Sequence, residues 1–160
     1  MLIDVLVAAT AIACAAMGGV FVAFSSFVMR ALARMPPSQG IAAMQSINVV
    51  AVTPVFMTAL FGTAAACLVV AASAVIEWRG LTSTYLLAGS LTYLIGAIAV
   101  TIIFNVPLNN ALAAANPASG DAALFWLKYV REWTAWNHVR TISGLVAAGL
   151  LTMAIVRLRA

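Results

Sequence analysis

Apolar residues along this chain fall into four long runs that contain no charged side chain: residues 5–29, 35–76, 80–120 and 141–156. A helix needs roughly 20 apolar residues to cross the hydrocarbon core of a bilayer, so this pattern predicts four transmembrane helices. We expect an all-α integral membrane protein, a four-helix up-down bundle that forms one domain over residues 1–160. The spans are predicted at residues 3–29, 49–76, 82–107 and 137–157.

Two of the helical segments are longer than a bilayer is thick. Residues 38–76 are broken only near Pro54, and residues 122–157 contain no proline and should form one long helix. At 1.5 Å per residue the first would measure about 57 Å, against a hydrocarbon core of ~30 Å. We therefore expect helices that extend beyond the bilayer on one side. Pro107 should kink the third span, because proline lacks the N–H that its turn requires.

Composition agrees with this reading. Hydrophobic residues make up 65% of the chain and charged residues 8%, whereas soluble domains carry about 25% charged residues. The net charge of +4 is spread over loops and chain ends without a basic cluster, which argues against nucleic acid as a partner. We expect a multi-pass protein of the cell (plasma) membrane, surrounded by membrane lipid. A homo-oligomer is an alternative to a single chain.

Polar side chains gather at one end of the predicted bundle. In an up-down bundle the ends of the first and third spans lie beside the starts of the second and fourth. That end collects Ser25, Ser26, Gln45, Asn48, Asn105, Asn109, Asn110, Asn137, His138 and Arg140. Each amide alone could be interhelical glue, and Arg140 alone could be a snorkelling anchor. Because ionisable residues inside membranes are rare and usually functional, the whole group predicts a ligand pocket.

Helical spacing orders these residues into faces. Thr101, Asn105 and Asn109 are four residues apart, so they should stack on one face of the third helix. Trp133, Asn137 and Arg140 should share one stripe of the last helix, with His138 on its adjacent edge. The aromatic residues Trp126, Tyr129, Trp133 and Trp136 also suit an interfacial belt.

Metal ligands are scarce in this chain. It has a single histidine, no carboxylate pair near it, and two cysteines, Cys14 and Cys67, that lie midway along apolar runs. These residues predict neither a zinc nor a non-haem iron site, and we expect no cofactor. Binding of a haem through a single axial histidine is an alternative.

Four short motifs in this order resemble the anthrone oxygenase-like family of small four-helix membrane proteins. They are Gly18-Gly19 with Phe-Ser-Ser downstream, MQSIN at 44–48, NVPLNN at 105–110 and WNHVRT at 136–141. The resemblance covers nearly the whole chain. It implies oxidation of a flat, anthrone-type aromatic by O₂ in a cofactor-independent monooxygenase reaction. It also implies a pocket formed by Asn48, Asn105, Asn109, Asn137, His138 and Arg140.

The residue types suit such a reaction, in which an acidic C–H loses a proton to give a delocalised anion. Histidine exchanges protons most readily near neutral pH, so we predict His138 as the proton acceptor. Arg140 and Asn109 are predicted as the other catalytic residues, holding the anion. The predicted substrate-binding residues are Gln45, Asn48, Asn105, Trp133, Trp136 and Asn137.

A second hypothesis is a non-catalytic membrane subunit or binder. The same amide-lined pocket could hold a quinone, a haem or a lipid.

Overall fold

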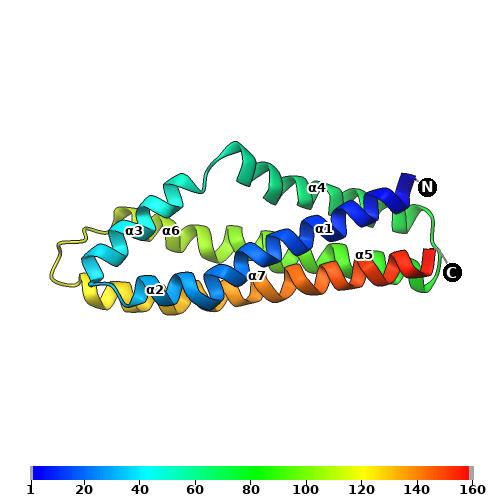
Figure 1. Cartoon of the computed structure of the whole chain (residues 1–160). Helices are drawn as coiled ribbons and strands as arrows, with labels where there is room; N and C mark the ends of the chain where they lie inside the picture. The colour runs from blue at the N-terminus through cyan, green and yellow to red at the C-terminus, as the bar shows by residue number, and fades with distance from the viewer. Residues whose placement is uncertain (1, 159–160) are drawn as a thin grey trace.

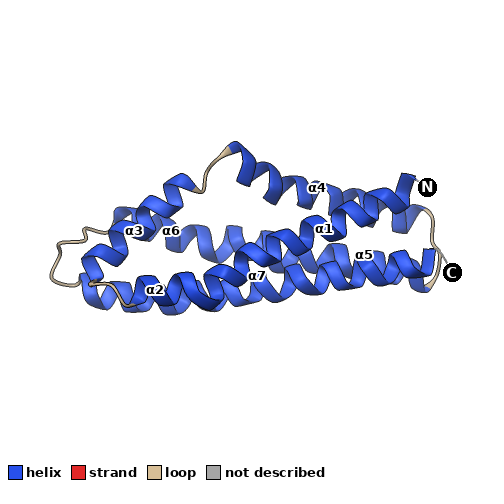
Figure 2. Cartoon of the chain, in the orientation of Figure 1, coloured by secondary structure: helices blue, strands red, loops and turns tan. Residues whose placement is uncertain are grey.

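The computed structural model describes residues 2–158, and helices account for nearly all of them (Figures 1 and 2). In chain order the elements are α1 (Leu2–Ala23), η1 (Phe24–Val28), α2 (Met29–Ala33), α3 (Pro37–Val50), α4 (Pro54–Ile76), α5 (Leu81–Tyr93), η2 (Leu94–Ala99), η3 (Thr101–Asn105), α6 (Val106–Ala114) and α7 (Ala122–Leu158). The η elements are π-helical turns within otherwise continuous helices.

Within residues 2–158, four helical stretches are long and apolar enough to cross a membrane. They cover Leu2–Ala33, Pro54–Ile76, Leu81–Ala114 and Ala122–Leu158. Leucine, isoleucine and valine side chains point outward all along them, as expected of surfaces that face lipid. The predicted all-α membrane bundle is confirmed.

The helices run alternately up and down, as Figure 1 shows. The start of α1 and the end of α7 lie at one end of the molecule, near the α4–α5 turn. The α2–α3 turn and the α6–α7 loop lie at the opposite end. The single long final helix is confirmed: α7 has 37 residues, about 56 Å at 1.5 Å per residue.

The second predicted helix is broken just ahead of Pro54, as its sequence suggested. Residues 51–53 leave the helix, and the Thr53 hydroxyl accepts a hydrogen bond from the Phe56 backbone at 3.2 Å to cap α4. This cap and the proline at the first helical position start a new helix at an angle to α3 (Figure 1).

Pro107 does not end its helix, because the turn before it is widened. In η3 the backbone N–H of Val106 bonds to the carbonyl of Thr101, five residues back. A π-helical turn of this kind inserts one extra residue and so relieves the clash that proline causes. A similar turn in η1 has the N–H of Met29 bonded to Phe24.

Two apolar cores fill the bundle, one towards each end. The first joins α1, α4, α5 and α7 around Cys14, Cys67, Tyr93 and Leu151; the sulfur atoms of the two cysteines lie 3.8 Å apart. The second joins α2, α3, α6 and α7 around Met44 and aromatic residues of α7. Between these cores lies a layer of polar side chains from η1, α3, η3, α6 and α7, and there the candidate site lies.

Candidate functional site

The polar layer is centred on Asn137, which is fully buried in the middle of α7. Its amide nitrogen donates to the Phe21 carbonyl at 2.8 Å and to the Ser25 hydroxyl at 2.7 Å, both on the first helical stretch. Its oxygen accepts from Nη2 of Arg140 at 2.6 Å. Asn137 and Arg140 are three residues apart and so share one face of the helix. Asn137 therefore ties α1 to α7 and orients the arginine.

Arg140 lies inside the bundle with 7% of its surface exposed. Its guanidinium lies between two aromatic rings, 4.6 Å from the centroid of Phe21 and 4.9 Å from that of Trp133. Nη1 donates to the Thr101 hydroxyl at 3.3 Å, and Nε has no partner. Cation–π contacts stabilise a desolvated guanidinium by about 2 kcal/mol. This is far less than a carboxylate would give, and within residues 2–158 no ion pair reaches Arg140.

The side chain of Asn109, on α6, is held in place by two side chains of α7. Its side-chain oxygen accepts from the Tyr129 hydroxyl at 3.0 Å and from the Trp133 indole N–H at 2.8 Å. Both donors come from α7 and are buried. Because the oxygen takes both bonds, the amide NH₂ of Asn109 points away from these two rings.

An apolar cavity of about 310 Å³ opens between these groups. Aromatic, methionine and valine side chains form most of its wall, and the polar part of the wall consists of Asn48, Thr101, Asn109, Asn137 and Arg140. Among these lining residues, all of them described by the structure, Arg140 is the one that titrates. The cavity can therefore hold a flat apolar molecule with one cation and several neutral amides against it.

Five of the nine predicted site residues meet at this cavity: Asn48, Asn109, Trp133, Asn137 and Arg140. Asn105 is buried behind it, where its amide donates to the Trp133 carbonyl at 3.3 Å. Gln45 donates to the carbonyls of Leu112 and Ala115 at 2.8 and 3.1 Å, so it caps the end of α6.

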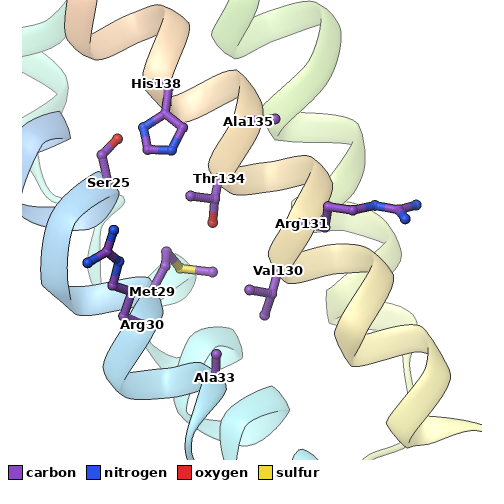
Figure 3. A pocket seen from close by; sticks show the side chains of 9 residues that line it. All are labelled: Ser25, Met29, Arg30, Ala33, Val130, Arg131, Thr134, Ala135 and His138. Atoms are coloured by element: carbon purple, nitrogen blue, oxygen red, sulfur yellow. The ribbon is translucent and has the colours of Figure 1, made fainter.

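The structure does not bring His138 to this cavity. His138 follows Asn137 directly, and one residue of α-helix turns the side chain by about 100°. It is exposed and lies in a separate surface groove of about 300 Å³ with Ser25, Met29, Arg30 and Thr134, as Figure 3 shows. The expectation that His138 shares one pocket with the amides and Arg140 is therefore wrong for this geometry.

Trp136 also points elsewhere. Its ring stacks on Phe104 with centroids 3.5 Å apart and planes at 8°, and it is partly exposed. In contrast Trp126, Tyr129 and Trp133 are buried and pack in the second core. The interfacial-belt interpretation is wrong for these three, because α2 and α3 cover the face of α7 that carries them.

Sequence reasoning missed two residues that shape the site. Phe21 supplies one ring against Arg140, and Tyr129 holds Asn109. Tyr129 lies four residues before Trp133 and so extends the Trp133–Asn137 stripe by one turn, a spacing visible in the sequence. Phe21 had no comparable signal, since it is one apolar residue among many.

The described part of the chain contains no cluster of metal ligands, because no three His, Cys, Asp or Glu side chains come together there. The one histidine lies outside the cavity, so a haem bound in the cavity would have no imidazole ligand from this chain.

Comparison with known protein families shows what the chain resembles. A family model described as anthrone oxygenase matches residues 51–150. The matched region includes α4 to α6 and most of α7, and with them Asn105, Asn109, Asn137 and Arg140. No curated protein and no solved structure is significantly similar to this chain.

Proposed function

Because the chain belongs to the anthrone oxygenase family, we propose that it is a membrane-embedded, cofactor-independent monooxygenase of the plasma membrane. The substrate is a flat aromatic molecule of the anthrone or polyketide type, with a CH₂ group next to aryl rings. In the reaction R₂CH₂ + O₂ gives R₂C=O + H₂O, so one oxygen atom enters the product and the other leaves as water.

The observation that carries this proposal is the state of Arg140. A buried ion without a counter-ion costs several kcal/mol, and here the compensation comes only from two rings, an amide and a hydroxyl. Such a cation is suited to an anion that arrives as substrate or forms during the reaction. An apolar wall beside it suits the aromatic part of the same molecule.

The proposed mechanism follows from that charge. Loss of one CH₂ proton leaves an anion that is delocalised onto the ketone oxygen. Arg140 and the amides of Asn48 and Asn109 stabilise this oxyanion, as donors in a water-poor site do most effectively. The cavity wall supplies no side-chain base, so we assign the proton to a water molecule that enters the cavity.

Oxygen then reacts with the bound anion without a further group. The anion passes one electron to O₂, and the carbon radical and superoxide combine to a peroxide at the former CH₂ carbon. Protonation of the peroxide and loss of water with the remaining C–H proton gives the ketone. The chain's residues hold the aromatic rings against the apolar wall of the cavity, beside Phe24, Phe56 and Met57, and Arg140 stabilises the negative charge.

The test uses the protein in lipid nanodiscs with anthrone as the probe. We expect O₂ uptake and anthraquinone formation in a one-to-one ratio. Arg140→Gln should lower turnover by about 10²- to 10³-fold, the usual effect of losing a donor to an oxyanion. His138→Gln is the matched control and should retain turnover. Equal activity of wild type and Arg140→Gln, both folded, would contradict the proposed role of the cation.

The second candidate is a binder of a quinone, a haem or a lipid. The unpartnered donors Nε of Arg140 and Nδ2 of Asn48 suit the carbonyl oxygens of a quinone in particular. Tight binding of anthraquinone together with no consumption of anthrone would favour this function.

A further inference from the structure

A second hollow lies beside the inner cavity, between α3 and α6. This α3–α6 groove has a volume of about 660 Å³. Four residues line both spaces: Asn48, Val52, Val106 and Asn109. The two hollows therefore adjoin at these four side chains, which we call the threshold.

The threshold carries no charge. Of the eight residues that line the groove, four are amides (Gln45, Asn48, Asn109 and Asn110) and four are apolar (Val49, Val52, Val106 and Ala113). The threshold lies at the break between α3 and α4, where Val50 is 66%, Val52 69% and Val55 81% exposed. No charged residue occurs in residues 35–76 or 80–120, which include both walls of the groove. Val49 and Val52 line the groove and are 76% and 69% exposed, so an apolar rim of the groove lies next to the start of the long apolar helix α4.

The face of the site between α1 and α7 is closed. There α1 crosses α7 at Gly18 and Gly144, and a Cβ added at Gly144 would lie 2.9 Å from the Cα of Gly18. Backbones this close, through small residues, form a tight interhelical contact. A molecule the size of three fused rings cannot pass between these two helices.

We propose that the α3–α6 groove is the lateral access path by which an apolar, flat aromatic substrate moves from the bilayer into the cavity. This inference rests on the proposed function, because it takes the cavity as the place of reaction. Val52 and Val106 flank the passage as apolar walls. Asn48 and Asn109 supply amide donors there, and Nδ2 of Asn48 is buried without a partner.

The threshold then determines which molecules reach the cavity. A molecule without an oxygen at its edge leaves the buried Nδ2 of Asn48 unsatisfied, whereas a ketone or phenol oxygen accepts from it. Charged molecules are excluded because the passage has no counter-ion. The substrate class is therefore a neutral, lipid-dissolved aromatic ketone that becomes an anion only after it reaches Arg140.

The experiment measures the kinetics of binding rather than turnover. Anthraquinone is mixed with the protein in nanodiscs, and quenching of tryptophan fluorescence is followed by stopped flow. Val52→Phe and Val106→Phe should lower the association and dissociation rate constants together by about tenfold, since an obstacle on the path changes rates more than affinity. Val52→Ala should raise both. Val50→Phe is the matched control: Val50 is exposed to almost the same extent, lines neither hollow, and its substitution should leave both rates unchanged.

The outcomes separate the two proposals. Wild-type rates in both folded phenylalanine variants would overturn the lateral path, while anthrone turnover would still support the proposed function. Failure of the wild-type protein to bind anthraquinone would overturn both. An association rate that follows the mole fraction of probe in the lipid, rather than its total concentration, supports access from the bilayer; the reverse dependence contradicts it.

Discussion

Two polar faces of α7, one residue apart, differ in almost every physical respect. On one face Asn137 and Arg140 are buried, hydrogen-bonded to α1 and η3, and closed in by aromatic rings. On the other face His138 and Arg131 are exposed on the rim of a surface groove, and Arg131 has a glutamate neighbour at 3.8 Å.

The comparison teaches that residue type alone does not identify the reactive group in a membrane bundle. Histidine is the natural candidate for proton transfer, but here it lies where water or headgroups solvate it. The arginine, which could have been an anchor, is the ion that the fold encloses. Solvation, more than intrinsic chemistry, separates the two faces.

The largest expected effect comes from removing the enclosed charge while keeping its volume. Arg140→Met should abolish anthrone turnover and raise stability by about 1–4 kcal/mol, because apolar replacements of buried ions are often stabilising. Thermal unfolding in detergent together with O₂ uptake measures both. A variant that lost stability along with activity would show that Arg140 mainly supports the fold.

Asn137→Leu should have the next largest effect. The change leaves the Ser25 hydroxyl and Arg140 with one partner fewer, and a buried polar group without its partner costs about 1–3 kcal/mol. We expect that loss of stability and about a tenfold loss of turnover as Arg140 loses its orientation. Thr134→Val, on the His138 face, removes a buried hydroxyl that has no partner; it should be neutral or stabilising in the same thermal assay.

Gly144→Ala should disturb the buried face by pushing apart α1 and α7 where they cross. The new Cβ would be within 3.2 Å of the Gly18 and Cys14 backbones, so α1 must move and carry Phe21 away from Arg140. We expect a loss of about 1–3 kcal/mol, as for other overpacked sites. Gly149 is in the same helix, and a Cβ added there would have no atom within 4 Å. Gly149→Ala should therefore stabilise the protein by less than about 1 kcal/mol.

The smallest effect is expected on the exposed face. His138→Ala should keep turnover within about twofold and stability within about 0.5 kcal/mol, as for surface substitutions generally. Its pH–rate profile should match that of the wild type. Loss of turnover in the folded variant would restore His138 as the proton acceptor and defeat the distinction between the two faces.

The sequence predicted much of the fold because the governing property is simple. Runs of apolar residues long enough to cross a bilayer specify helices, and proline at 54 marked the α3–α4 break. The continuous α7 was equally readable from the absence of proline after residue 121.

The site was predicted in part, and the failures have physical causes. Spacing placed Asn137 and Arg140 on one stripe, yet it could not say that the adjacent edge with His138 lies outside the covered face. On the third helix, Thr101, Asn105 and Asn109 were expected to stack. Thr101 and Asn109 line the cavity and Asn105 does not, because the Asn105 amide is turned to the Trp133 carbonyl of α7. Spacing along one helix does not tell which neighbouring backbone group a buried amide will bind.

The bond between Asn137 and the Phe21 carbonyl joins residues 116 positions apart, and this has a consequence for biosynthesis. Inserting an arginine at the centre of a helix costs about 2.5–3.5 kcal/mol at the translocon. When α7 leaves the ribosome, α1, α4 and α5 have already been made and can receive it. The charged helix thus enters a prepared cleft instead of bare lipid, and the site comes into being at the last step of synthesis of the described chain. Nascent chains that end before α7 carry Phe21, Asn48 and Asn109 but lack Trp133, Asn137 and the cation.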